Sequence, residues 1–218
     1  MNAVVPEPTA AKMAVRTAVI LVLFVVVFTG LLSSVYYWTL PTIQAAASEE
    51  KMKLIDEVLP RSHYDNALLE DTVEIATTQA LGLDEKTTAY RARKDGKPFA
   101  LVLEAVAPDG YAGKIRLLIA VGANGALLGV RVTQHKETPG LGDYIEPKKD
   151  KNKARPWITQ FDGLNPEALD AREWKVKKDG GRFDSVAGAT VTPRAVIKAV
   201  GKASAYVAEN RERLFASQ

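Results

Sequence analysis

Residues 184–192 form a short segment in which one hydroxyl has only small neighbours. The segment reads DSVAGATVT, and Ala187, Gly188 and Ala189 leave open space around the Thr190 hydroxyl. A helix is predicted to follow, and the first turn of a helix carries backbone N–H groups without intrahelical partners, which attract anions. These residue types suit a hydroxyl that holds an anionic group. The alternative is an ordinary loop before a helix.

A second segment with unusual residue types covers residues 135–142 and reads HKETPGLG. Pro139, Gly140 and Gly142 predict a shaped loop whose backbone can come close to a ligand. His135 and Glu137 are separated by one residue, which could suit a metal ion in a strand, but a third ligand is not apparent. We therefore predict no metal site here. The alternative for this segment is an ordinary turn that leaves a sheet.

Other catalytic patterns are absent from the sequence. It contains no GxGxxG fingerprint, no phosphate-binding loop and no Ser-His-Asp order with a supporting motif. The chain has no cysteine, which excludes disulfides, thiolate iron–sulfur clusters and thiol nucleophiles, and it has only two histidines. Its 29 Lys and Arg against 26 Asp and Glu give a net charge of +3 without a dense basic stripe. We expect no nucleic-acid partner.

Three alternating segments precede the HKETPGLG loop and are predicted to form adjacent antiparallel strands. Two turn signals separate them, Asp109-Gly110 and Asn124-Gly125. The apolar positions are Phe99, Leu101, Leu103 and Ala105, then Ile115, Leu117, Ile119 and Val121, and finally Leu127, Leu128, Val130 and Val132. The HKETPGLG loop would then leave the last strand of this sheet.

A helix of about four turns is predicted directly after the DSVAGAT residues. Thr192 is the expected N-cap and Pro193 the first helical residue. The apolar face of this helix comprises Val196, Ile197, Val200 and Val207. The start of the helix would place its N–H groups near Thr190.

The stretch from Glu146 to Arg155 contains four Lys, one Arg and one Asp. We interpret it as a solvated loop. The alternative is an electrostatic contact to another protein chain, for which the sequence offers no independent support. Trp157, Ile158 and Phe161 are expected to return the chain to the core after this loop.

The N-terminal region contains a long apolar run. From Thr17 to Trp38, 17 of 22 residues are apolar, and a helix of this length reaches roughly 33 Å, enough to cross a hydrocarbon core of about 30 Å. We predict an N-terminal tail at 1–16, a transmembrane helix at 17–38 and a membrane-proximal helical segment at 39–86. A signal peptide cleaved after residues 45–47, three alanines, is the alternative, but its apolar region would usually span only about 7–15 residues.

Charges near the apolar run predict its orientation. Lys12 and Arg16 precede the run and Lys51 and Lys53 follow it, so the numbers are equal. No charge lies within ten residues after Trp38, and a long C-terminal domain can translocate regardless of its own charge. We therefore expect a cytoplasmic N-terminus and a C-terminal domain on the outer side.

Three features together resemble one family: the apolar run, residues 110–142 and the DSVAGAT motif. They are similar to the G subunit of the Rnf (or Rsx) electron-transport complex, whose FMN-binding domain is shared with the C subunit of the sodium-pumping NADH:quinone reductase. The resemblance covers essentially the whole chain. The flavinylation pattern of the family, Asp-x-x-Ser/Thr-Gly-Ala-Thr, corresponds to Asp184–Thr190. Ala187 stands where Ser or Thr is commoner, so one hydroxyl is missing while Thr190 is kept.

This resemblance implies an α+β fold, in which one transmembrane helix precedes a single FMN-binding domain at 87–218 with an antiparallel sheet and flanking helices. It implies that a flavin transferase joins FMN to Thr190 through a phosphodiester. The other implied cofactor-binding residues are Asp184, Ser185, Gly188, Ala189 and Thr192 around the phosphate, and Glu137, Thr138, Gly140 and Leu141 beside the flavin ring. His135 would lie near the ring.

The resemblance also implies a function as an electron relay in the bacterial inner membrane, with the C-terminal domain in the periplasm. Electrons moving between ferredoxin and NAD would pass through the flavin, coupled to cation transport by other subunits, so the chain would not be catalytic alone. Its partners would be those subunits, the flavin transferase and the lipid bilayer. Two alternatives stay open: the C subunit of the quinone reductase, whose members are usually longer, and a flavin-free membrane-anchored binding or scaffold protein, which only Ala187 favours.

Overall fold

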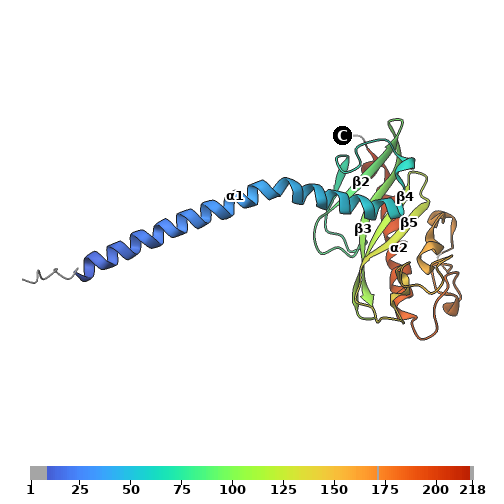
Figure 1. Cartoon of the computed structure of the whole chain (residues 1–218). Coiled ribbons are helices and arrows are strands. Elements are labelled where there is room, and N and C mark those ends of the chain that lie inside the picture. The colour runs from blue at the N-terminus through green and yellow to red at the C-terminus, as the bar shows by residue number, and fades with distance from the viewer. Residues whose placement is uncertain (1–8, 171, 217–218) are drawn as a thin grey trace, which may run out of the picture. The chain divides into compact units, whose positions relative to one another are not determined.

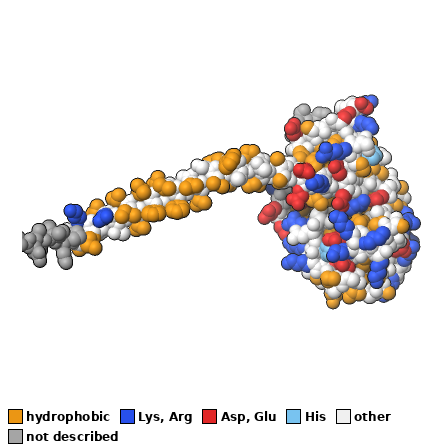
Figure 2. All heavy atoms as spheres, in the orientation of Figure 1, with side chains coloured by type: hydrophobic (Ala, Val, Ile, Leu, Met, Phe, Trp, Pro, Cys, Tyr) orange, Lys and Arg blue, Asp and Glu red, His pale blue; other side chains and the backbone are white. Residues whose placement is uncertain are grey.

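The first element of the chain is one long helix. The computed structural model describes residues 9–170 and 172–216, and in it α1 runs from Ala10–Val58, with Pro41 inside the helix (Figure 1). The run predicted at 17–38 lies within α1, and its side chains are exposed and mostly apolar (Figure 2). Among the described residues, α1 is the one helix long and apolar enough to cross a membrane, since an 18-residue window in it has a mean hydropathy of 2.8.

The chain divides into two compact units, with the boundary between Glu50 and Lys51. The segment 39–86, expected to be helical, is helical only as far as Val58, because Pro60 lacks the N–H that a continuing helix needs. After it come a short 3-10 helix, η1 (Arg61–His63), and strand β1 (Thr72–Ile75). The folded unit therefore begins well before the predicted boundary at residue 87.

A five-stranded sheet forms the centre of the second unit. Its strands are antiparallel and adjacent in chain order, from β1 through β2 (Thr87–Lys94), β3 (Lys97–Gly110), β4 (Gly113–Gly122) and β5 (Leu127–Gln134). The three predicted strands are β3, β4 and β5. The turn expected at Asp109-Gly110 lies two residues later, at Tyr111 and Ala112, because Gly110 still pairs with Gly113. Gly113 has a φ of 126°, which glycine adopts without steric cost.

The two faces of the sheet pack against different helices. On one face lies α2 (Val191–Glu209), seen in red beside the strands in Figure 1. On the other face, the end of α1 buries Ile55 and Val58 against β2, β3 and β4. A Cβ atom at Gly129 in β5 would lie 2.5 Å from the Val58 carbonyl oxygen, so glycine is needed for this close approach. The α+β class and the antiparallel sheet are confirmed.

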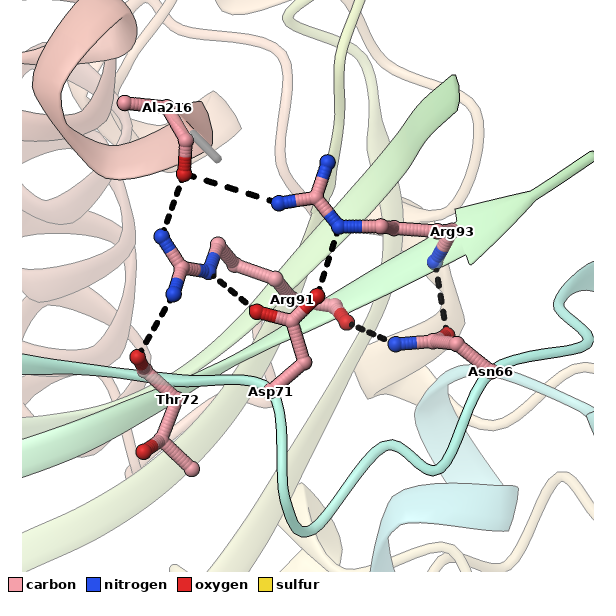
Figure 3. Close-up of polar contacts among 6 residues, drawn as sticks. All are labelled: Asn66, Asp71, Thr72, Arg91, Arg93 and Ala216. Carbon is pink, nitrogen blue, oxygen red and sulfur yellow. Dashed lines mark hydrogen bonds and ion pairs between the residues drawn. The ribbon is translucent and has the colours of Figure 1, made fainter. Parts of the chain in front are cut away.

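A charged cluster joins the C-terminal end of the chain to the edge of the sheet (Figure 3). The Asp71 carboxylate accepts hydrogen bonds of 2.6 Å from the Nε atoms of both Arg91 and Arg93. Both guanidiniums also donate to the Ala216 carbonyl oxygen, over 2.5 and 3.5 Å, and Arg91 donates to the Thr72 carbonyl at 2.8 Å. One carboxylate thus compensates two cations, of which Arg91 is almost fully buried.

The described residues between β5 and α2 form short helices, turns and one isolated β-bridge between Val176 and Phe183, and aromatic packing holds them together. As predicted, Trp157, Ile158 and Phe161 return it to the core, and the Phe161 ring lies against Phe183, with centroids 4.9 Å apart. The short elements in this region are 3-10 helices, η2 (Asp143–Ile145), η3 (Trp157–Phe161), η4 (Pro166–Ala168) and η5 (Lys177–Asp179). Helix α3 (Arg211–Phe215) follows α2.

Candidate functional site

A cavity of about 230 Å³ lies where three segments meet: the β3–β4 turn, the HKETPGLG loop and the start of α2. Ligand pockets usually measure about 300–1,000 Å³, so this cavity can hold part of a larger ligand. Its lining includes seven of the residues expected from the sequence: Glu137, Thr138, Leu141, Gly188, Ala189, Thr190 and Thr192. The two segments singled out by their residue types are therefore neighbours in space.

Three expected residues, Asp184, Ser185 and Gly140, do not belong to the lining of the cavity. Two lining residues, Tyr111 and Val191, were not predicted, and a third, Gly142, was predicted only as part of the loop that approaches a ligand. The sequence predicts the turn at Asp109-Gly110, two residues before its place in the structure, and therefore does not single out Tyr111. The signal that could have found this residue is an aromatic side chain in the short segment between Gly110 and Gly113.

Thr190 is half-buried and directly precedes α2. Its side chain makes no capping hydrogen bond to the helix, so its hydroxyl is not used to satisfy the first N–H groups. Thr192 is not the N-cap that the sequence predicts: it lies inside the first turn, is 2% exposed and donates its hydroxyl hydrogen bond to Glu137. The helix is also longer than the expected four turns, with 19 residues.

The Glu137 carboxylate connects the three segments around the cavity. It is 4% exposed; its Oε1 accepts a hydrogen bond of 3.0 Å from the Ala112 N–H, and its Oε2 accepts one from the Thr192 hydroxyl. A Cβ atom at Gly142 would lie 2.8 Å from Thr192 Oγ1 and 2.9 Å from Glu137 Oε2. Glycine at 142 therefore leaves the room that this buried contact needs.

His135 supports the loop and is not part of the cavity lining. Its Nδ1 accepts a hydrogen bond of 3.0 Å from the Glu137 N–H, and its Nε2 lies 3.0 Å from Glu146 Oε1. Because Nδ1 is the acceptor, the ring proton of the neutral histidine is on Nε2, which donates to Glu146. The ring thus fixes the backbone at Glu137.

The DSVAGAT loop is held through its backbone at both ends. The Tyr144 hydroxyl donates to the Ala189 carbonyl over 3.3 Å, and burial raises the pKa of Tyr144 to about 12, so it stays a donor at neutral pH. Trp157 Nε1 donates to the Asp184 carbonyl over 2.6 Å, and the Asp184 carboxylate forms a 2.6 Å ion pair with Lys177. Asp184 therefore helps to hold the loop from outside the cavity.

No group of three or more His, Asp or Glu side chains suited to a metal ion occurs in the part of the chain that the structure describes. The chemistry of the cavity comes from hydroxyls, one carboxylate, the start of a helix and apolar side chains. This set suits an anionic group attached to an apolar ring.

Removing the Glu137 carboxylate is expected to destabilise the fold. Glu137→Ala leaves the Ala112 N–H and the Thr192 hydroxyl without their buried acceptor, which costs about 1–3 kcal/mol per unsatisfied group. Urea unfolding of the full chain in detergent, followed by tryptophan fluorescence, measures this loss. Glu85→Ala is the control at an exposed glutamate and is expected to change the free energy of unfolding little. Equal stability of both variants would contradict the bridging role of Glu137.

Comparisons with known proteins show which family this chain resembles. Residues 110–205 match the FMN-binding domain family, and residues 1–58 match the RnfG N-terminal region. The chain is 48% identical over 203 residues to the G subunit of the ion-translocating oxidoreductase complex of Pseudomonas aeruginosa UCBPP-PA14, covering 93% of this chain and 92% of that protein. The corresponding G subunit of Shewanella loihica is 40% identical over 200 residues, covering 92% of each chain. The crystal structure of Shewanella oneidensis NqrC has 24% identity, covers 65% of each chain and gives a TM-score of 0.42.

Proposed function

The chain belongs to the G-subunit family of ion-translocating oxidoreductase complexes, and from this we propose that it is an electron carrier of such a complex, with FMN attached covalently to Thr190. The relatives are named as G subunits and the N-terminal match is to RnfG, which favours this family over the C subunit of the quinone reductase. FMN, when bound, supplies the electron transfer, and the protein sets its position and environment.

The position of the Thr190 hydroxyl is the observation that carries this proposal. Thr190 lines the cavity, its side chain does not cap α2, and the residue directly precedes that helix. In the attachment, a bond forms between Thr190 Oγ1 and the phosphorus of the FMN group of a flavin nucleotide donor. The bond from that phosphorus to the donor's leaving group breaks at the same time, and the hydroxyl proton leaves with that group. The net change on the chain is the addition of FMN less one water. The phosphodiester keeps one negative charge, which a helix N-terminus stabilises by about 0.3–1 kcal/mol.

The rim of the cavity suits the apolar ring of a flavin. In the folded unit, the exposed large apolar side chains among the described residues are Leu54, Tyr111, Leu141, Val186 and Val191. Three of them, Tyr111, Leu141 and Val191, line the cavity, and Val186 belongs to the DSVAGAT loop. Tyr111 is 70% exposed, so a ring above the cavity would cover apolar surface that water now contacts.

We assign different roles to the remaining motif residues. Asp184 holds the loop through Lys177 and Trp157, and Gly188, at a φ of 83°, allows the backbone to turn before Thr190. Ala187 is exposed and does not line the cavity, so the hydroxyl that the family pattern would place there is not needed for the lining.

The proposed location is the bacterial inner membrane. α1 would serve as a single-pass anchor, because it combines sufficient length with an uncharged stretch between Arg16 and Glu49. The absence of charge within ten residues after Trp38 favours a folded unit on the periplasmic side. The other subunits of the complex and the flavin transferase would be its protein partners.

Mass measurement of the full chain tests the proposed attachment. The chain is produced together with a flavin transferase in an exporting bacterium, and its intact mass and peptide map are recorded. We expect a gain equal to FMN less one water on the peptide that contains Thr190. An unmodified chain beside a transferase that modifies a known substrate would overturn the proposal.

A further inference from the structure

The loop between Glu146 and Pro156 presents cations and turns its acids inward. Its five cations are all exposed: Lys148, Lys149, Lys151, Lys153 and Arg155. Asp150 is 8% exposed, and its carboxylate accepts hydrogen bonds of 2.6 Å from the Trp157 N–H and 2.8 Å from the Asn152 N–H. Glu146 is engaged by His135. Neither acid is therefore directed at the exposed cations.

Cations elsewhere in the folded unit commonly have acidic partners at the surface. Arg194 pairs with Asp179 at 2.7 Å, and Lys198 pairs with Asp109 at 2.6 Å. Within residues 9–170 and 172–216, the ion pairs include none of the five loop cations. Among the described residues, the five cations of the loop thus have no ion-pair partner.

The ends of this loop adjoin the DSVAGAT segment. The chain enters the loop after Tyr144 and leaves it at Trp157, and these two rings contact each other with centroids 5.7 Å apart. Tyr144 bonds to the Ala189 carbonyl, and Trp157 bonds to the Asp184 carbonyl. The positive loop therefore projects from the wall that holds the proposed flavin attachment.

We propose that this loop docks an acidic protein surface on another subunit of the complex, the one that exchanges electrons with this chain. The inference rests on the proposed function, because only an electron carrier needs its redox partner beside the segment that holds the flavin. Complementary charge steers two proteins together and sets their orientation. Anionic lipid would also attract five cations, but binding to a fluid lipid surface does not require a binding loop of fixed shape. The backbone of this loop has a fixed shape, since Asp150 and Asn152 accept backbone hydrogen bonds within it. A fixed shape favours a protein surface as the partner.

Crosslinking in the assembled complex tests the docking independently of the flavin. A zero-length carbodiimide joins lysine amines to carboxyl groups in direct contact. We expect products between Lys149, Lys151 or Lys153 and acidic residues of another subunit. Their yield should fall several-fold when ionic strength rises from about 0.1 M to about 1 M, because the Debye length shortens from about 10 Å to about 3 Å. Absence of such products in an intact complex would overturn the proposal.

Charge reversal gives a second measurement in the same complex. Lys149→Glu, Lys151→Glu and Lys153→Glu together are expected to slow the reduction or oxidation of the flavin by the partner several-fold at low salt. The control has the same change in charge on exposed lysines away from the loop: Lys94→Glu, Lys97→Glu and Lys202→Glu. Lys94 and Lys97 flank the β2–β3 turn, at the opposite end of β3 from the cavity. Equal rates in both variants would contradict the docking.

Two further outcomes distinguish the protein docking from lipid binding and from the proposed flavin attachment. The chain alone is placed in nanodiscs of phosphatidylcholine, with and without phosphatidylglycerol, and acetylation of the loop lysines is measured. Protection by phosphatidylglycerol that equals the protection in the complex would identify lipid as the ligand and overturn the protein contact. A chain that crosslinks but carries no flavin would contradict the proposed function alone, and a flavin-loaded chain without crosslinks would contradict the docking alone.

Discussion

Thr190→Ala is expected to abolish covalent flavin attachment in a chain that still folds. The substitution removes the only atom to which the phosphorus can be joined at this position. It costs little stability, because the Thr190 side chain caps nothing, whereas loss of a capping threonine usually costs about 0.5–2 kcal/mol. In-gel flavin fluorescence and intact mass measure attachment, and urea unfolding measures stability.

Two variants make this prediction specific to one hydroxyl. Thr190→Ser keeps the nucleophilic oxygen and should retain attachment. Thr138→Ala removes another hydroxyl-bearing side chain from the lining of the same cavity and should also retain it. Covalent flavin on the Thr190→Ala chain, or loss of flavin from the Thr138→Ala chain alone, would show that the attachment site is elsewhere.

Asp71→Ala is expected to have the largest effect on stability. It leaves the Arg91 and Arg93 guanidiniums, 4% and 12% exposed, close together without their common carboxylate. Breaking a buried ion pair in this way costs about 3–5 kcal/mol, against a total of about 5–15 kcal/mol for a typical domain. Urea unfolding of the full chain measures the loss. Asp84→Ala, which removes the exposed partner of Lys114, is the control and should have a much smaller effect.

The same cluster predicts how stability changes in acid. Burial alone would raise the pKa of Asp71, but the hydrogen bonds and charges of Arg93 and Arg91 outweigh it and hold the pKa below its ordinary value. The unfolded chain therefore binds this proton more tightly. The contribution of Asp71 is complete above the unfolded pKa of about 3.9 and is lost as pH falls through the folded value. Urea unfolding from pH 7 downward should show less acid sensitivity in Asp71→Asn than in the wild type, and identical profiles would contradict this.

Local patterns in the sequence predicted the elements whose residues alternate in a simple way. Strands β3, β4 and β5 follow the period of two, because one face of each lies in the core beneath α2. Strand β2 was not predicted because it has few large apolar residues and one of its buried positions is occupied by Arg91. An arginine in a sequence is normally expected at the surface. The sequence does not show that Asp71, 20 residues away, pairs with Arg91 and allows it to be buried.

Residue type, spacing and family resemblance were enough to predict the long apolar helix, three neighbouring strands and two of the three segments that form the cavity. The packing of the fold was needed to show that Tyr111 lines the cavity, that Thr192 bonds to Glu137 instead of capping α2, and that the loop acids turn inward. These contacts join residues that are not neighbours along the chain. Glu137 and Thr192 are 55 residues apart, and a hydrogen bond between them depends on how the sheet and α2 pack, which no local pattern records.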